Sequence, residues 1–310
     1  MNSILDDTAV VFSCDENFFG LAKGLVLSLR QKPNDISPKN IYFLDIGASH
    51  NSLQWLEAQG VSIIRNVEKF CLPEQVSEAG RNYRVAQLLR PELPRIITGY
   101  DYYMWIDSDV WLQDLSSLTV FRRAAEAKHG AAVVVPTIDC TYSILLEDCT
   151  SFTKYAQEWY TPLYGPAIAN EFSRKTILNS GMFCMAASSQ LWDAWRQELS
   201  KVRYGEIKND FCKHLAEQTC FNYLLHTTKN YSILDATYNY NVHLGCVRRN
   251  SHTGRVTTLQ EIEREISVVH LTYSSKFISY YLNAGLLFEA GDYLLESERQ
   301  TLLQLNHYSI

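Results

Sequence analysis

The first half of the chain alternates between short apolar runs and segments whose apolar residues recur at helical spacing. The predicted strands lie at 8–13, 40–44, 61–64, 101–106 and 131–135, and the predicted helices at 17–30 and 51–59. Strands that alternate with helices pair in parallel and carry helices on both faces of their sheet. We therefore expect an α/β fold with a mixed, mainly parallel central sheet, which binds ligands where its strands end.

Charge and hydropathy exclude several classes of partner. The formal net charge is −6, and no run of basic residues is long enough to overcome the repulsion of nucleic acid. No apolar run approaches the roughly 18 residues of a spanning helix, and the first seven residues are too polar and acidic for a signal peptide. The eight cysteines include no C-x-x-C pair and are typical of reduced thiols. We expect a cytoplasmic protein with no nucleic-acid partner and no transmembrane segment.

The most informative motif is the pair Asp107 and Asp109 at the end of the predicted strand 101–106. Residues i and i+2 of a strand point to the same face, so the two carboxylates lie close together and need a cation. A hard divalent ion binds such oxygens, can hold a diphosphate, and offsets charge on a departing diphosphate. Two alternatives are a solvated turn and a phosphohydrolase, whose D-x-D motif usually lies near the N-terminus.

Five further motifs accompany this pair in a fixed order. They are Asp15-Glu16-Asn17-Phe18, then residues 42–47, then Arg84 with Arg90, then residues 178–181 with 217–222, and finally the interval from His270 to Lys276. Each motif is weak alone. The five together, from about Val10 to Lys276, resemble family 8 of the glycosyltransferases, which includes bacterial lipopolysaccharide galactosyl- and glucosyltransferases and glycogenin.

The resemblance implies a GT-A fold and a role for each matching residue. The implied donor-binding residues are Asp15, Asn17, Phe18, Arg84, Arg90, Ser108, Gly181 and Lys276. The implied catalytic residues are Asn179, Glu217 and Gln218. The implied ligands of Mn²⁺ or Mg²⁺ are Asp107, Asp109 and His270. In the family, the first three donor residues bind the nucleotide base, Arg90 (with Arg84 as the alternative) contacts the donor sugar and phosphate, and Lys276 holds the diphosphate.

Several positions depart from the family pattern. Glu217 stands where Asp is commoner and is one methylene longer, although it is expected beside the anomeric carbon with Gln218. Tyr273 replaces a glycine, and residues 277–278 replace Pro-Trp, so the backbone of that loop must differ. The run 155–164 offers aromatic faces for sugar rings, although core or dimer contact is the more frequent reason for such a run.

The resemblance implies a metal-dependent glycosyltransferase that moves a hexose, glucose or galactose, from a UDP-sugar with retention. The acceptor, whether carbohydrate, glycolipid or protein, is left open. A non-catalytic nucleotide-sugar-binding protein on the same fold and a metal-dependent phosphohydrolase are the alternatives. We expect one GT-A domain at 1–276 and a C-terminal helical segment at 277–310 that packs on this domain or extends it.

Overall fold

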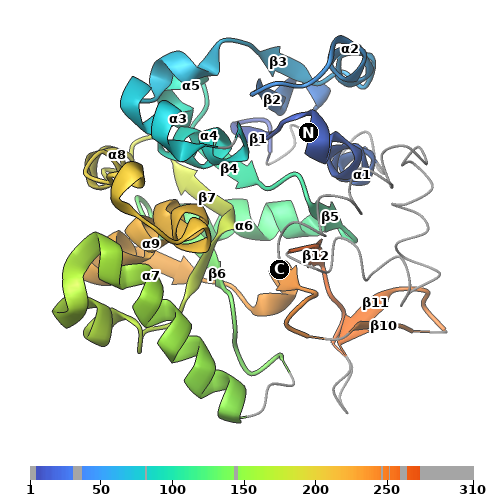
Figure 1. The fold of residues 1–310 in the computed structure, drawn as a ribbon. Helices are drawn as coiled ribbons and strands as arrows, with labels where there is room; N and C mark the ends of the chain where they lie inside the picture. The colour runs from blue at the N-terminus through green and yellow to red at the C-terminus, as the bar shows by residue number, and fades with distance from the viewer. Residues whose placement is uncertain are drawn as a thin grey trace.

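A seven-stranded sheet lies at the centre of the computed structural model, in the order β3-β2-β1-β4-β7-β6-β8 (Figure 1). The structure describes residues 5–30, 37–80, 82–142, 146–245, 247–250, 252–258 and 264–272. The strands of this sheet are β1 (Thr8–Cys14), β2 (Ile41–Asp45), β3 (Ser62–Ile64), β4 (Tyr102–Ile106), β6 (Ala132–Pro136), β7 (Leu178–Ala186) and β8 (Tyr231–Ile233). Neighbouring strands are parallel except where β7 meets β4 and β6. The predicted mixed, mainly parallel sheet is confirmed.

The central strands are apolar on both faces, which explains their burial. In β1, Val10 and Phe12 belong to one hydrophobic core, whereas Ala9 and Val11 belong to a second core. Successive side chains of a strand point to opposite faces, so the two cores lie on opposite sides of the sheet. A sheet that is apolar on both faces needs helices on both faces.

Helices cover both faces of the sheet, as this pattern requires. They are α1 (Phe19–Leu29), α2 (His50–Ala58), α3 (Pro73–Ala79), α4 (Asn82–Leu89), α5 (Leu93–Ile96), α6 (Ser116–Ala127), α7 (Leu146–Phe172), α8 (Leu191–Leu199) and α9 (Asp210–Thr228). The core that contains Phe12 includes residues of α1, α2 and α6, and the core that contains Val11 includes residues of α4, α8 and α9. All seven predicted elements are present, with their ends shifted by two residues or fewer.

A smaller three-stranded sheet lies beside the carboxyl end of β4. Strand β5 (Val110–Leu112) pairs antiparallel with β12 (Val268–His270), and β12 pairs in parallel with β9 (Tyr240–Asn241). The pairing of β5 with β12 brings distant parts of the chain side by side (Figure 1). A hairpin of β10 (Val247–Arg249) and β11 (Val256–Thr258) completes the described strands.

Two predictions from the sequence concern membrane-spanning helices and the C-terminal part of the chain. Among the described residues, no helix is both long enough and apolar enough to cross a membrane. The predicted domain boundary after residue 276, the segment 277–310 and Lys276 all lie outside the described residues.

Candidate active site

Three strands of the central sheet bring polar residues to one edge. Strands β1 and β4 run in parallel, so Asp15 and Asp107 follow them at the same edge. Strand β7 runs in the opposite direction and places its first residues at that edge, with Met182 paired to Ile106. The Asp107 amide donates to the Gly181 carbonyl at 2.7 Å, which joins β7 to the turn after β4.

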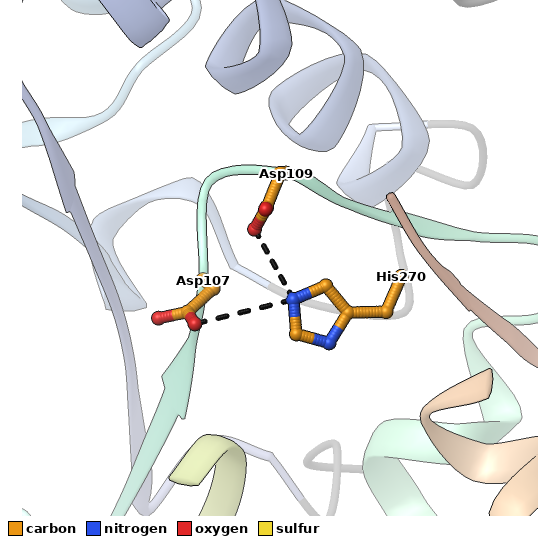
Figure 2. A group of neighbouring side chains, drawn as sticks. All are labelled: Asp107, Asp109 and His270. Atoms are coloured by element: carbon orange, nitrogen blue, oxygen red, sulfur yellow. Dashed lines mark ion pairs between the residues drawn. The ribbon is translucent and has the colours of Figure 1, made fainter. Parts of the chain in front are cut away.

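The side chains of Asp107, Asp109 and His270 converge at this edge (Figure 2). His270 Nε2 lies 3.2 Å from Asp109 Oδ1 and 4.0 Å from Asp107 Oδ2. One ligand atom from each residue lies within 4.8 Å of the other two. Pairing of His270 with Val110 in the small sheet is what brings the imidazole to the two carboxylates. Two carboxylate oxygens and one imidazole nitrogen form a set that fits a divalent ion.

Gly181 leaves the space in which these ligands converge. A Cβ atom on this residue would lie 2.6 Å from Asp107 Oδ2, 2.7 Å from His270 Cε1 and 2.8 Å from Asn179 Oδ1. These distances are shorter than van der Waals contact, so a side chain here would displace the carboxylate or the imidazole. The glycine of the N-S-G motif is therefore required by the three-residue cluster.

Hydrogen bonds hold the carboxylate oxygen of Asp107 that points away from His270. Its Oδ1 atom accepts hydrogen bonds from Arg90 Nη2 at 2.5 Å and from Trp105 Nε1 at 2.6 Å. These donors leave Oδ2 as the oxygen that faces His270. The carboxylate is thus oriented before any ion arrives, which lowers the cost of binding one.

Arg90 belongs to a buried ion-pair network that sequence analysis did not predict. Its guanidinium bonds Glu217 Oε2 as well as Asp107, and it donates to Ser180 Oγ at 2.7 Å. Arg90 is 4% exposed and Glu217 is 0% exposed. Glu217 is therefore paired with the guanidinium of Arg90 in this structure, and its expected place beside the anomeric carbon stays a prediction. Burial raises the pKa of Glu217 to about 7, although Arg90 opposes the shift.

The two amide residues expected at the donor sugar hold the start of β7. Gln218 is half-buried, and its Oε1 accepts from the Ser180 amide at 3.1 Å. Asn179 Oδ1 accepts from the Gly181 amide at 2.6 Å and from Asn239 Nδ2 at 3.1 Å. Both side chains therefore fix the backbone beside the cluster of Asp107, Asp109 and His270.

The loop after β1 presents two side chains at the same edge. Asp15 is 6% exposed and accepts from the Asn17 amide at 3.1 Å, which starts the 3-10 helix η1 (Glu16–Phe18). Burial raises the pKa of the Asp15 carboxyl. Asn17 is exposed and Phe18 is half-buried, so both are accessible to a ligand. Asp15 shapes the loop, and its two neighbours offer an amide and an aromatic ring.

Arg84, the alternative to Arg90, joins two helices. It is 2% exposed, and its Nη2 pairs with Asp210 Oδ1 at 2.6 Å, which links α4 to α9. Ser108 is 9% exposed between the two aspartates. The sequence analysis did not single out Ser180 or Trp105, although Ser180 lies within the motif at 178–181 and Trp105 within the predicted strand 101–106. Asn239 had no signal in the sequence beyond its place in an alternating Tyr-Asn run.

Solved glycosyltransferases share this arrangement of strands and helices. The galactosyltransferase LgtC, in complex with donor and acceptor sugar analogs, matches with a TM-score of 0.52 at 14% identity, over 95% of this chain and 100% of LgtC. The chain has the GT-A fold. The bifunctional glycosyltransferase WbbM matches with a TM-score of 0.54 at 14% identity, over 88% of this chain and 47% of WbbM. Thus the chain spans about half the length of WbbM.

A third solved structure gives the same fold. The glycosyltransferase GlyE of Streptococcus pneumoniae, in its apo form, matches with a TM-score of 0.50 at 16% identity, over 98% of this chain and 64% of GlyE. No family model matches the chain, and no curated protein matches it in sequence. At these identities the likeness concerns the fold alone.

Proposed function

We propose that this chain is a metal-dependent glycosyltransferase of the family 8 type, which transfers glucose or galactose from a UDP-sugar with retention. The observation that carries the proposal is the convergence of Asp107, Asp109 and His270 around the space that Gly181 leaves open. This cluster lies at the sheet edge where Asn17 and Phe18 are accessible. A site for a divalent ion beside an aromatic ring and an amide suits a nucleotide diphosphate.

Each accessible group has a role in this proposal. Phe18 packs against the base, and Asn17 binds its edge. Asp107, Asp109 and His270 hold Mn²⁺ or Mg²⁺, which offsets the charge on the departing diphosphate. Gln218 orients the donor sugar from α9, with its oxygen anchored on Ser180. Lys276, outside the described residues, is proposed to hold the diphosphate, and the protein is proposed to act in the cytoplasm.

Nucleotide release from a panel of nucleotide sugars tests this function. We expect the protein to release UDP from UDP-glucose or UDP-galactose with Mn²⁺, and to stop when EDTA is added. Binding of the donor without any release would favour a nucleotide-sugar-binding protein. Release of inorganic phosphate from phosphorylated sugars, with nucleotide sugars untouched, would favour a phosphohydrolase.

Asp109→Asn tests the metal ligands within the same assay. Loss of one carboxylate weakens the site for a hard cation, so we expect at least a hundredfold loss of Mn²⁺-dependent UDP release. Asp101→Asn is the matched control, because Asp101 is exposed and precedes the other end of β4. Donor binding by Asp109→Asn with the metal dependence of the unchanged protein would show that Asp109 is not a ligand.

A further inference from the structure

Asn239 is a fully buried amide beside the start of β7. It is 0% exposed, and its Nδ2 donates to Asn179 Oδ1 at 3.1 Å. Its own oxygen, Oδ1, is buried and has no hydrogen-bond partner among the described residues. A buried amide with one side unpaired costs stability, and an apolar side chain of similar size would avoid that cost. The hydrogen bond to Asn179 is therefore the feature that accounts for an asparagine at this position.

The polarity of the hydrogen bonds fixes which way the Asn179 amide faces. The Gly181 backbone amide can only donate, so the atom that meets it at 2.6 Å must be the oxygen of Asn179. Because that oxygen can only accept, the atom of Asn239 that meets it must be the nitrogen. The two donors use both lone pairs of Asn179 Oδ1. The N–H groups of Asn179 Nδ2, which no described residue accepts, are left for an acceptor oxygen of a ligand.

Asn179 borders the proposed ion site. The position that a Cβ atom of Gly181 would take lies 2.8 Å from Asn179 Oδ1 and 2.6 Å from Asp107 Oδ2. The same position lies 2.7 Å from His270 Cε1. The Asn179 amide is therefore next to the place where the diphosphate and the sugar of a bound donor would meet.

The backbone of Asn239 is held on both sides. Its amide donates to the Ala236 carbonyl at 3.0 Å, at the end of the 3-10 helix η6 (Ala236–Tyr238). The residues that follow form β9, which pairs with β12 so that Asn241 lies beside His270. The side chain of Asn239 thus joins the strands around His270 to the first residues of β7. A support of this kind orients the Asn179 amide before a ligand arrives.

We propose that Asn239 is a positioning residue for the transfer reaction. It holds the Asn179 amide so that the N–H groups of Asn179 donate to a hydroxyl oxygen of the donor sugar. Asn239 itself does not touch the donor, and without it the Asn179 side chain is held only by the Gly181 amide. This inference rests on the proposed glycosyltransfer and adds to it a buried residue that acts through Asn179.

Two substitutions separate the hydrogen bond of Asn239 from its packing. Asn239→Ala removes the donor and leaves a cavity, whereas Asn239→Leu removes the donor and keeps the volume. We expect both to lower kcat/KM for Mn²⁺-dependent UDP release from UDP-glucose or UDP-galactose about tenfold, the effect of one hydrogen bond. The Kd of free UDP with Mn²⁺, measured by calorimetry, should not change, because UDP carries no sugar to meet Asn179.

Asn40→Ala is the matched control. Asn40 is 1% exposed, and its Nδ2 donates to the Leu5 carbonyl at 3.0 Å. It precedes β2 and therefore lies at the opposite end of the parallel strands from the site. We expect Asn40→Ala to lower the melting temperature and to leave kcat/KM unchanged.

A double-mutant cycle tests whether Asn239 acts through Asn179. If it does, Asn239→Leu has nothing left to position once residue 179 is changed by Asn179→Ala. The kcat/KM of the double variant should then equal that of Asn179→Ala within about twofold, whereas independent roles would multiply the two losses. A role of Asn239 in stability alone would not produce this dependence on Asn179.

Three results would overturn this inference: full kcat/KM in a folded Asn239→Leu protein, losses that multiply in the cycle, and a Kd of UDP that rises as much as kcat/KM falls. If the wild type releases no UDP from any donor, the proposed function fails, and NMR of the ¹⁵N-labelled asparagine side chains still tests the positioning. The Asn179 signals, identified by their loss in Asn179→Ala, should move in Asn239→Leu and not in Asn40→Ala. Signals that stay in place in Asn239→Leu would show that Asn239 does not orient Asn179.

Discussion

At the scale of single residues, the cluster of Asp107, Asp109 and His270 depends on neighbours that give it space and orientation. Gly181 provides space, Trp105 and Arg90 orient one oxygen of Asp107, and Glu217 bonds the guanidinium of Arg90. A motif match identifies such residues as part of the site. It does not distinguish residues that contact a substrate from residues that position their neighbours. Glu217 is 0% exposed, which favours a supporting role for this residue.

Gly181→Ala should abolish metal binding while the protein still folds. The added Cβ would lie 2.6 Å from Asp107 Oδ2 and 2.7 Å from His270 Cε1, so the ligands must move apart. Overpacking of this kind costs about 1–3 kcal/mol of stability. We expect a lower melting temperature and at least a hundredfold weaker Mn²⁺ affinity, measured by calorimetry. A variant that binds Mn²⁺ as tightly as the wild type would show that the cluster does not hold the ion.

Glu217→Gln should change how stability depends on pH. The pKa of Glu217 is raised to about 7 by burial, from an ordinary 4.5, so the folded protein keeps a proton that the unfolded chain releases. This contribution to stability is complete below pH 4.5 and is lost as the pH rises through 7. Between pH 5 and pH 8, the free energy of unfolding of the wild type should fall relative to Glu217→Gln by about 3 kcal/mol or less.

Urea unfolding of both proteins at a series of pH values measures this difference. Because all other titrating groups are shared, the difference between the two curves isolates Glu217. A difference that is constant from pH 5 to pH 8 would show that Glu217 is ionised throughout and that Arg90 outweighs burial.

At the scale of elements, helix α9 and strand β7 act as one unit. Asn222 of α9 accepts from the Leu178 amide at 2.7 Å and donates to the Leu178 and Gln218 carbonyls at 2.7 and 2.8 Å. One turn earlier, Gln218 bonds Ser180. The register of the helix against the first residues of β7 is thus set by two side chains at the i and i+4 positions.

Asn222→Ala should lower the free energy of unfolding more than it lowers catalytic activity. Asn222 is 2% exposed, and its loss leaves backbone groups of Leu178 buried without partners, which costs about 2–4 kcal/mol. Asn170→Ala, at an exposed position on α7, should change the free energy of unfolding by about 0.5 kcal/mol or less. Urea denaturation gives both values, and equal stability of the two variants would contradict this role of Asn222.

Strands and helices can be predicted from the sequence where a single local residue pattern determines them. The strands and helices of the first half follow from apolar spacing alone, and the Asp pair, His270 and Gly181 follow from ordered motifs. The reversed direction of β7 is set by pairing with β4 and β6, which no local pattern encodes. Likewise, the burial of Glu217 depends on where Arg90 lies, a contact between residues far apart in the sequence.

At the scale of the whole molecule, the cluster of Asp107, Asp109 and His270 joins two sheets. Asp107 follows β4 of the central sheet, whereas His270 ends β12 of the small sheet. The two sheets are also linked through the short turn between β4 and β5, through the shared core, and through the hydrogen bond from Asn241 Nδ2 to the Thr137 carbonyl. An ion bound by all three residues would therefore stabilise the position of one sheet on the other.

Mn²⁺ should raise the melting temperature of the protein through this link. At a Mn²⁺ concentration 100 times the Kd, binding adds about 2.7 kcal/mol, or about 5 °C for a chain of this size. Asp109→Asn should show no shift, while Asp101→Asn should match the wild type in a thermal scan. The backbone amide hydrogens of β5 and β12 should exchange with solvent more slowly when Mn²⁺ is bound than when it is absent. An equal shift in Asp109→Asn would place the ion elsewhere.

The pairing of β12 between β5 and β9 also bears on how the chain is made. On the ribosome, both aspartates and β5 emerge long before His270, so the nascent chain carries two close carboxylates without their third ligand. During that interval β5 lacks the strand that covers its edge, and an uncovered edge can pair with another chain. A translation product cut short before β12 would thus be at once unable to hold an ion with three ligands and prone to self-association.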